Sequence, residues 1–343
     1  MNSSFALKVL AALLVAAGIS CALTPLVKWL ARKIGAMDIP KDERRMHKKP
    51  TPRLGGLGIF VGFLVSFLIF GKLERELIGI LLGAGLIVAI GILDDKYALR
   101  ALPKFAVQII AAVIVVAHGC RIEQFMGLQF PVWLSYALSI LWIVTITNAV
   151  NFIDGLDGLA AGVSAISAGT MLVVAMLLVP EPNAMLSAIV LAGLVGGCIG
   201  FIPYNFNPAS IFMGDTGSTF LGFMLASVSI FGLFKTYAMI SFAVPFLLLG
   251  LPIFDICFAV LRRISRGQSP MHADRGHVHH RLIDMGFSQK QAVAICYLIS
   301  AALGLCAVVL ADSGEAQALI VLAALLVIGT IAAKLIFGKH HKK

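Results

Sequence analysis

Six aspartates lie within or next to stretches of sequence that are apolar enough to cross a membrane. They are Asp94, Asp95, Asp154, Asp157, Asp215 and Asp255. A carboxylate at the centre of a bilayer costs about 2.5–3.5 kcal/mol, so six would cost about 15–20 kcal/mol, comparable to the stability of a whole domain. Any fold of this chain must therefore bring most of these side chains to water, cations or substrate.

The composition favours an all-α, polytopic integral membrane protein. The 343 residues are 59% hydrophobic and 13% charged, whereas soluble proteins have about 25% charged residues. The six cysteines form no Cys-x-x-Cys pair, which argues against a disulfide or zinc framework. We expect one membrane domain over residues 1–343 with eleven transmembrane helices. The expected spans are 5–30, 54–71, 77–93, 102–118, 131–150, 159–179, 184–202, 217–234, 238–261, 292–311 and 316–337.

The positive charges predict the orientation of these spans. With the N-terminus outside and the C-terminus in the cytoplasm, 22 of the 27 Lys and Arg residues are cytoplasmic, as the positive-inside rule requires. All six aspartates then lie at cytoplasmic span ends and can converge on one site, with cytoplasmic loops 31–53 and 262–291 contributing to it. Ordinary topology determination and attraction to anionic lipid explain the positive charge of this face. Alternatively, the charge attracts anionic substrates.

The adjacent carboxylates Asp94 and Asp95 end one expected span and are followed by Lys96. Two carboxylates so close repel each other, an arrangement that suits a general base or a cation site. A solvated helix end is an equally good explanation.

A second polar segment, Asn148–Gly158, has a polar residue at every third position. On a helix, Asn151, Asp154 and Asp157 would share one broad face. The two glycines of the segment permit close approach by a ligand or another backbone. The alternative is a polar turn between two spans.

A third segment, Asn205–Ser218, contains Gly-Asp-Thr-Gly at the start of an expected helix. The oxygens of Asp215 are hard ligands that suit Mg²⁺, which usually takes one or two protein carboxylates and leaves places for phosphate oxygens. Alternatively, Asp215 or Thr216 caps the helix, although a cap does not need the flanking glycines.

Two basic loops complete the pattern. The first contains Pro-Thr-Pro-Arg-Leu-Gly-Gly, where Lys48 and Arg53 are suited to hold a phosphate and the glycines to tight helix packing. The second contains His277, His279, His280 and Arg281. Its His-x-His-His spacing suggests zinc, but no cysteine is near and the flanking arginines repel a cation. Binding of phosphate or sugar hydroxyls fits this loop better.

Two prolines and a glycine interrupt the expected span 238–261 and predict a kinked helix. A bent span opens a lateral groove for a lipid tail, and simple helix packing explains the kink equally well. Asp255 lies in this span without a motif, so we expect a structural role or a pair with Arg262 or Arg263.

Together these motifs resemble the polyprenyl-phosphate N-acetylhexosamine-1-phosphate transferases of glycosyltransferase family 4 (WecA/TagO type). The resemblance extends from Asp38 to Gly286 and rests on Pro-Thr-Pro-Arg-x-Gly-Gly, Asp-Asp-Lys, Asn-Phe-Ile-Asp-Gly-Leu-Asp-Gly, Phe-Met-Gly-Asp-Thr-Gly-Ser and His-x-His-His. It implies an enzyme of the bacterial inner membrane that transfers GlcNAc-1-phosphate from UDP-GlcNAc to undecaprenyl phosphate and releases UMP. This is the first membrane step of a cell-envelope polysaccharide such as teichoic acid or the O-antigen of lipopolysaccharide.

The resemblance also implies Mg²⁺ as cofactor, with Mn²⁺ as a substitute, no nucleic-acid partner, and leaves a homodimer open. The implied catalytic residues are Asp94, Asp95, Asp154 and Asp215. The implied Mg²⁺ ligands are Asp215 and Asn151. The implied nucleotide ligands are Asp157, Asn205 and Asn151. The sugar and diphosphate would be bound by His277, His279, His280 and Arg281, and the lipid phosphate by Lys48, Arg53 and Lys104.

Two other functions stay open at this point. The related phospho-MurNAc-pentapeptide transferases (MraY type) have a different histidine loop and typically ten spans. A cation-coupled transporter also uses membrane acids, but its sites lie near the bilayer midplane between internal repeats. Here the acids lie at span ends, and we find no inverted repeat.

Overall fold

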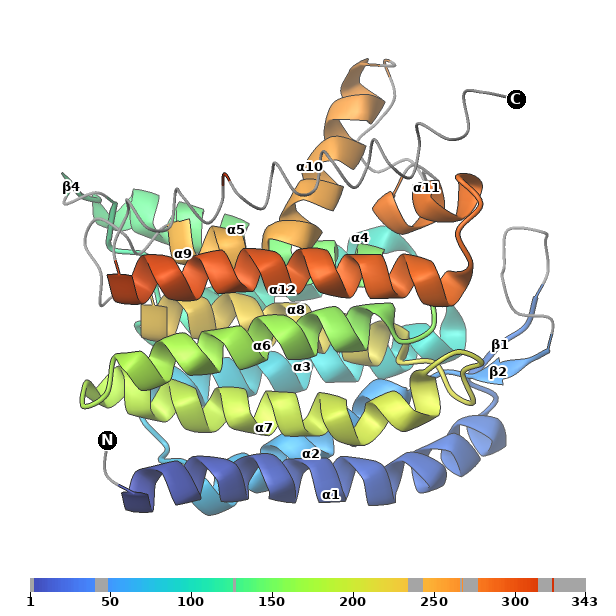
Figure 1. Ribbon diagram of the computed structural model, residues 1–343, viewed down its shortest axis with the longest axis horizontal. Helices are drawn as coiled ribbons and strands as arrows, with labels where there is room; N and C mark the ends of the chain where they lie inside the picture. Colours follow the sequence, from blue (N-terminus) through green and yellow to red (C-terminus); the bar gives the residue numbers. More distant parts are fainter. Residues whose placement is uncertain are drawn as a thin grey trace.

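The computed structural model describes residues 3–40, 49–125, 128–233, 243–265, 267, 277–313 and 323. Most of its helices run side by side in one bundle (Figure 1). The helices of the bundle are α1 (Ser3–Ile34), α2 (Gly55–Phe70), α3 (Arg75–Tyr97), α4 (Ala101–Ala117), α5 (Val132–Ile153), α6 (Leu159–Leu177), α7 (Pro182–Asn205), α8 (Gly214–Val228), α9 (Ala243–Leu248) and α12 (Gln289–Ser313). A π-helical turn, η1 (Ser229–Leu233), continues α8, and two further helices are α10 (Gly250–Ser265) and α11 (Val278–Asp284).

Short strands add two small antiparallel pairs to this helical fold. The strand β1 (Met37–Asp38) pairs with β2 (Thr51–Pro52), and β3 (Gln124–Phe125) pairs with β4 (Leu128–Gln129). The β1–β2 pair and α11 lie at one end of the bundle, whereas α1 begins at the other end (Figure 1).

The outer surface of the bundle is apolar enough to contact lipid. Six described helices, α1, α3, α5, α6, α7 and α12, are long and apolar enough to cross a membrane, and α2 and α4 are shorter apolar helices. Large apolar side chains are exposed along these helices, among them Leu7, Leu10, Leu14, Leu68, Ile69 and Leu82. A water-soluble monomer rarely exposes so much apolar surface, and helices satisfy their backbone hydrogen bonds within lipid. The chain is therefore a multi-pass membrane protein, as predicted.

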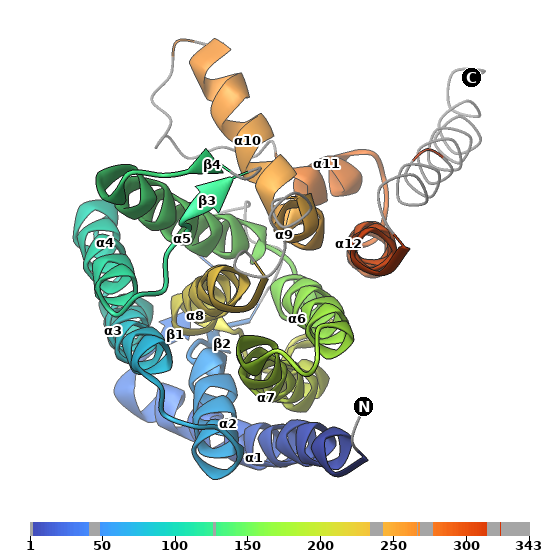
Figure 2. The ribbon, with the colours of Figure 1, turned by 90° about the vertical axis from the view of Figure 1, so that its left-hand side faces the viewer.

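Helix α8 lies at the centre of the bundle (Figure 2), where it contacts α2, α3, α5, α6 and α7. Nearly all of its residues are buried. Glycines allow this close packing: a Cβ on Gly56 of α2 would collide with Gly217, and a Cβ on Gly91 of α3 with Thr216. The tight packing fixes the N-terminal end of α8, where Asp215 lies.

The expected spans agree with the observed helices from the first to the eighth. The expected ninth span, 238–261, instead contains two helices, α9 and α10, which are separated at Leu249. Pro252 lies in the first turn of α10, where its missing N–H costs no helical hydrogen bond. Helix α10 leans away from the bundle (Figures 1 and 2). The expected eleventh span, 316–337, lies almost entirely outside the described residues.

Candidate active site

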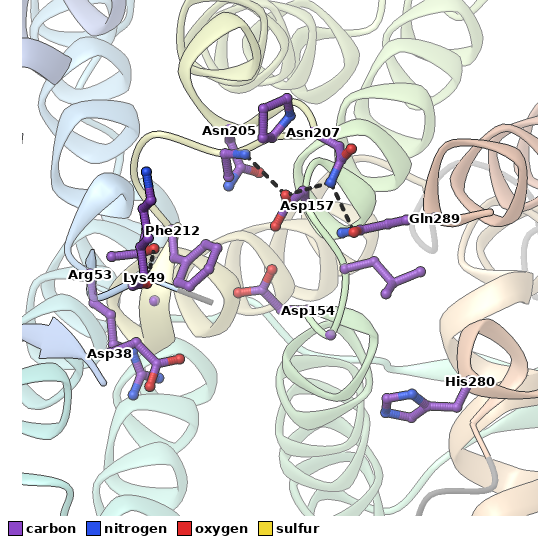
Figure 3. Close-up of a pocket in the computed structure, with 16 residues that line it drawn as sticks. Asp38, Lys49, Arg53, Asp154, Asp157, Asn205, Asn207, Phe212, His280 and Gln289 are labelled. Carbon is purple, nitrogen blue, oxygen red and sulfur yellow. Dashed lines mark hydrogen bonds between the residues drawn. The ribbon is translucent and has the colours of Figure 1, made fainter. Parts of the chain in front are cut away.

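A cavity of about 610 Å³ opens at the end of the bundle that holds β1, β2 and α11. This volume lies within the usual range for small-molecule sites. Five of the predicted site residues line it: Arg53, Asp154, Asp157, Asn205 and His280. In Figure 3, Arg53 lies on one side of the cavity, His280 on the other, and Asp154 between them.

Next to the cavity, Lys104 of α4 bridges Asp94 of α3 and Asp215 of α8. Its Nζ lies 2.9 Å from Asp94 Oδ2 and 2.7 Å from Asp215 Oδ2. The other oxygen of Asp94 accepts a hydrogen bond from the N–H of Leu99 at 2.8 Å. Three helices thus bring two carboxylates and one ammonium group together, and this confirms the predicted convergence of these motifs.

The buried carboxylate of Asp95 accepts three hydrogen bonds from the first turn of α8. The donors are the N–H of Asp215 at 2.9 Å and the N–H and hydroxyl of Thr216 at 3.1 and 2.7 Å. The first N–H groups of a helix have no partner within the helix, and a negative charge there complements the helix dipole. Gly214 has φ +72°, and a Cβ on it would collide with the Asp95 carboxylate. The glycine before Asp215 is therefore explained by this contact.

Arg53 reaches the same carboxylates from the segment between β2 and α2. Its Nε lies 3.4 Å from Asp95 Oδ1 and its Nη2 lies 3.5 Å from Asp215 Oδ1. Backbone hydrogen bonds between residues 52–56 and 212–213 hold this segment beside the start of α8. Arg53 and Lys104 therefore both contact the carboxylate of Asp215, while Lys48 lies outside the described residues.

The prediction that Asn151, Asp154 and Asp157 share one helix face is wrong. Helix α5 ends at Ile153, and the glycine-containing turn that follows places both aspartates outside the helix. Asn151 remains in α5, where its Nδ2 donates to Ser218 Oγ of α8 at 2.8 Å. The alternative of a polar turn is the correct one.

The two aspartates of this turn have different surroundings. Asp157 Oδ2 accepts hydrogen bonds from Asn207 Nδ2 at 2.9 Å and from the N–H of Ala209 at 3.0 Å. Asp154 lies in the cavity wall, where burial and the nearby charge of Asp215 raise the pKa of its carboxyl to about 7. Asp157 therefore holds the loop before α8, while the pKa of Asp154 lies close to neutral pH.

Asn205 is buried and its amide is hydrogen-bonded to backbone on both sides. Its Oδ1 accepts from the N–H of Gly158 at 3.1 Å, and its Nδ2 donates to the carbonyl of Ile211 at 3.0 Å. The residue thereby ties the loop before α8 to the start of α6, in addition to lining the cavity.

The histidine loop contributes one side chain to the cavity, that of His280. His277 and His279 are buried behind it with parallel rings, 5.8 Å between centroids. Burial lowers the pKa of His279 to about 3, so its ring is neutral. Arg281 is exposed on α11 and is not among the residues that line the cavity. Of the four predicted sugar and diphosphate ligands, His280 is thus the one placed to touch a ligand there.

Further polar or aromatic cavity residues were missed by the sequence analysis: Asp38, Lys49, Asn207, Phe212 and Gln289. Figure 3 shows Asn207 joined by hydrogen bonds to Asp157 and to Gln289, with 2.8 Å between Asn207 Nδ2 and Gln289 Oε1. Asn207 and Phe212 belong to the Asn205–Ser218 motif, so the sequence could have indicated them as site residues. An amide at the start of α12 gives no signal in the sequence.

The donor set at this site fits Mg²⁺. Among the described residues no three His, Cys, Asp or Glu side chains form a ready-made metal site, but Mg²⁺ usually needs only one or two carboxylates because phosphates and water fill its other positions. The site combines three cations, Arg53, Lys104 and Lys49, with a larger number of carboxylates. The latter are Asp38, Asp94, Asp95, Asp154, Asp157 and Asp215. An additional cation would offset this negative charge when an anionic ligand binds.

Comparison with known proteins shows that the chain is similar to glycosyl transferases. Residues 77–233 match the profile of glycosyl transferase family 4. A probable undecaprenyl-phosphate N-acetylglucosaminyl 1-phosphate transferase of Bacillus subtilis (strain 168) is 43% identical over 84% of this chain and 81% of its own length. A decaprenyl-phosphate N-acetylglucosaminephosphotransferase of Mycolicibacterium smegmatis is 36% identical over 83% of this chain and 78% of its own length. An undecaprenyl-phosphate alpha-N-acetylglucosaminyl 1-phosphate transferase of Escherichia coli (strain K12) is 26% identical over 80% and 76%.

Proposed function

The chain belongs to glycosyl transferase family 4, and we propose that it transfers GlcNAc-1-phosphate from UDP-GlcNAc to undecaprenyl phosphate and releases UMP. The structural observation that supports this best is the bridge of Lys104 between Asp94 and Asp215 beside a cavity of about 610 Å³. Such a site offers positive charge to a phosphate nucleophile next to a volume suited to a nucleotide sugar.

In the proposed reaction an oxygen of the lipid phosphate attacks the β-phosphorus of UDP-GlcNAc. The new P–O bond forms as the bond from that phosphorus to the bridging oxygen breaks, and UMP leaves with the electron pair. Lys104 and Arg53 neutralise the lipid phosphate, and their partly exposed side chains, at 26% and 28%, leave room for its approach. Asp94 orients this phosphate through Lys104, whose Nζ lies 2.9 Å from Asp94 Oδ2. The phosphate itself is mostly deprotonated at pH 7 because its second pKa is near 6.

Mg²⁺, with Mn²⁺ as a substitute, is the proposed cofactor, held by Asp215 and Asn151. When bound, such an ion polarises the diphosphate as a Lewis acid. The chain supports both ligands: Asp95 fixes the turn that contains Asp215, and Ser218 accepts a hydrogen bond from the amide nitrogen of Asn151. This hydrogen bond directs the amide oxygen of Asn151, the harder ligand, away from Ser218.

The proposed setting is the bacterial inner membrane, with eleven spans, the N-terminus outside and the C-terminus in the cytoplasm. In this orientation 22 of 27 Lys and Arg residues are cytoplasmic, which the positive-inside rule favours. The cavity then faces the cytoplasm, where UDP-GlcNAc is available. The product would begin a cell-envelope polysaccharide.

The test is UMP release by the purified protein in detergent with UDP-GlcNAc, undecaprenyl phosphate and Mg²⁺. We expect release that requires all three and stops with EDTA. Asp215→Asn should lower kcat about 1,000-fold or more because it removes a charge at the reacting phosphate. The matched control Asp312→Asn, at the far end of α12, should keep wild-type activity. Turnover of UDP-MurNAc-pentapeptide in place of UDP-GlcNAc, or no UMP from any UDP-sugar, would overturn the proposal.

A further inference from the structure

The carboxylate of Asp255 is buried, with 2% of the residue exposed, although it stands in none of the sequence motifs. Its Oδ2 lies 2.6 Å from His277 Nδ1, and its Oδ1 accepts a hydrogen bond from the N–H of Val278 at 2.7 Å. A buried carboxylate is costly unless it is hydrogen-bonded. One side chain of α10 thus makes two strong contacts with the beginning of α11.

These contacts determine which nitrogen of the His277 ring carries a proton and how the ring is oriented. An ionised carboxylate only accepts hydrogen bonds, so both of its partners must donate. His277 therefore carries a proton on Nδ1, and its ring orientation is fixed by the same bond. The ring is enclosed further by Phe152 of α5, with 5.7 Å between the ring centroids.

A continuous series of contacts leads from His277 to the cavity. The His277 ring stacks on that of His279, at 5.8 Å and 7° between planes. The His279 ring packs against Gly155 so closely that a Cβ there would collide with its Nε2. The ring of His280 lies 4.3 Å from that of His279 and lines the cavity. The His279 ring therefore contacts both the turn between Asp154 and Asp157 and the side chain of His280.

We propose that Asp255 is a positioning residue for the sugar-nucleotide side of the active site. Through His277 it holds α11 against the turn of Asp154 and Asp157, and thereby places His280 in the cavity. This inference rests on the proposed function for its kinetic test, while its structural test is independent of any activity.

The substitution Asp255→Asn separates this role from simple space filling. An amide has nearly the same shape but offers one acceptor and one donor group to two donors. Either Val278 loses its acceptor, or His277 must change its tautomer or lose its partner. Each outcome removes a hydrogen bond or replaces one to a charged acceptor by a weaker neutral one, which loosens the support of His280 without creating a cavity.

The kinetic test is a double-mutant cycle with Asp255→Asn, His277→Gln and the double variant. We expect Asp255→Asn to lower kcat/KM for UDP-GlcNAc about 10- to 100-fold, because a displacement of about 1 Å has an effect of this size. The KM for undecaprenyl phosphate should stay within about twofold. The double variant should be no worse than the more damaged single variant. The proposal would be overturned if the losses of kcat/KM in the two single variants multiplied in the double variant. It would also be overturned if Asp255→Asn lowered kcat/KM equally for both substrates.

The structural test is hydrogen exchange of the same proteins, measured by mass spectrometry without substrates. Asp255→Asn should speed exchange in peptides covering residues 277–286 and 152–158, and the matched control Asp284→Asn, at an exposed site of α11, should not. Unchanged exchange in Asp255→Asn would overturn the positioning role even in an inactive protein.

A wild-type protein that releases no UMP would overturn the proposed function while this test still decides the role of Asp255. If Asp255→Asn does not fold, Gly155→Ala should speed exchange in 277–286 from the other side of the contact.

Discussion

The two acidic motifs of the site, Asp94 with Asp95 and Asp154 with Asp157, divide their work in the same way. In each motif one carboxylate is hydrogen-bonded to the backbone that leads into α8. Asp95 accepts from the first turn of that helix, and Asp157 accepts from the N–H of Ala209 in the loop before it. The other member, Asp94 or Asp154, lies beside the ligand region.

The two motifs differ in their partners. The first lies within the last turns of α3, and its carboxylates contact the cations Lys104 and Arg53. The second lies in a turn, and Asp157 receives hydrogen bonds from a neutral amide and a backbone N–H. We infer that the first motif handles the charge of phosphates and the second shapes the cavity for the nucleotide sugar. Substitution of each aspartate by asparagine tests this division.

Among the substitutions in these two motifs, Asp94→Asn is expected to have the largest effect. Its carboxylate contacts Lys104 beside Asp215, so kcat for UMP release should fall about 100-fold or more. The KM values and the thermal unfolding temperature should change little, since asparagine can still accept the hydrogen bond that the Asp94 carboxylate receives from the N–H of Leu99. An unchanged kcat would remove Asp94 from the chemistry.

Asp95→Asn should combine a smaller loss of kcat, about 10-fold, with a lower unfolding temperature. Asparagine cannot accept all three hydrogen bonds from Asp215 and Thr216, and each buried group left without a partner costs about 1–3 kcal/mol. We therefore expect Tm in detergent to fall by roughly 5 °C. A Tm equal to that of Asp94→Asn would contradict the assigned difference between the neighbours.

Asp157→Asn should mainly affect the binding of UDP-GlcNAc. Both hydrogen bonds go to the same oxygen, Oδ2, so asparagine can keep both but without the charge of the acceptor. Hydrogen bonds to a neutral acceptor are weaker than those to a carboxylate, so the loop that lines the cavity is held less firmly. We expect the KM for UDP-GlcNAc to rise about 10-fold at most, with kcat and the KM for undecaprenyl phosphate unchanged. A loss confined to kcat would place Asp157 with the first motif instead.

The positions of the helices could be predicted from the sequence because length and apolar content are local properties. Asp94, Asp95 and Asp215 could be placed at helix ends for the same reason, and a common face followed from the charge distribution. The repeat of polar residues from Asn151 was misleading, because a three-residue spacing fits one face of a helix and also fits a polar turn. The glycines between these residues end the helix and favour the turn.

The pairing of Asp95 with the start of α8, and of Asp255 with His277, could not be predicted from the sequence. These contacts join residues 120 and 22 positions apart, and they depend on how α3, α8, α10 and α11 pack. The expectation for Asp255 considered arginines on its own helix, whereas the structure gives it a histidine from the next one. Gln289 shows the same limit, because its hydrogen bond with Asn207 comes from the position of α12.

The smallest expected effect concerns the pH dependence of stability at Asp154. The pKa of this carboxyl rises from 3.8 to about 7 in the folded protein, so between these values the folded state binds more protons than the unfolded state. Its contribution is fully present below pH 3.8 and is lost as the pH rises through about 7. Without metal or substrate, Asp154→Asn should therefore raise Tm relative to wild type more at pH 8 than at pH 5. An equal difference at both pH values would show that the pKa of Asp154 does not lie between pH 5 and pH 8.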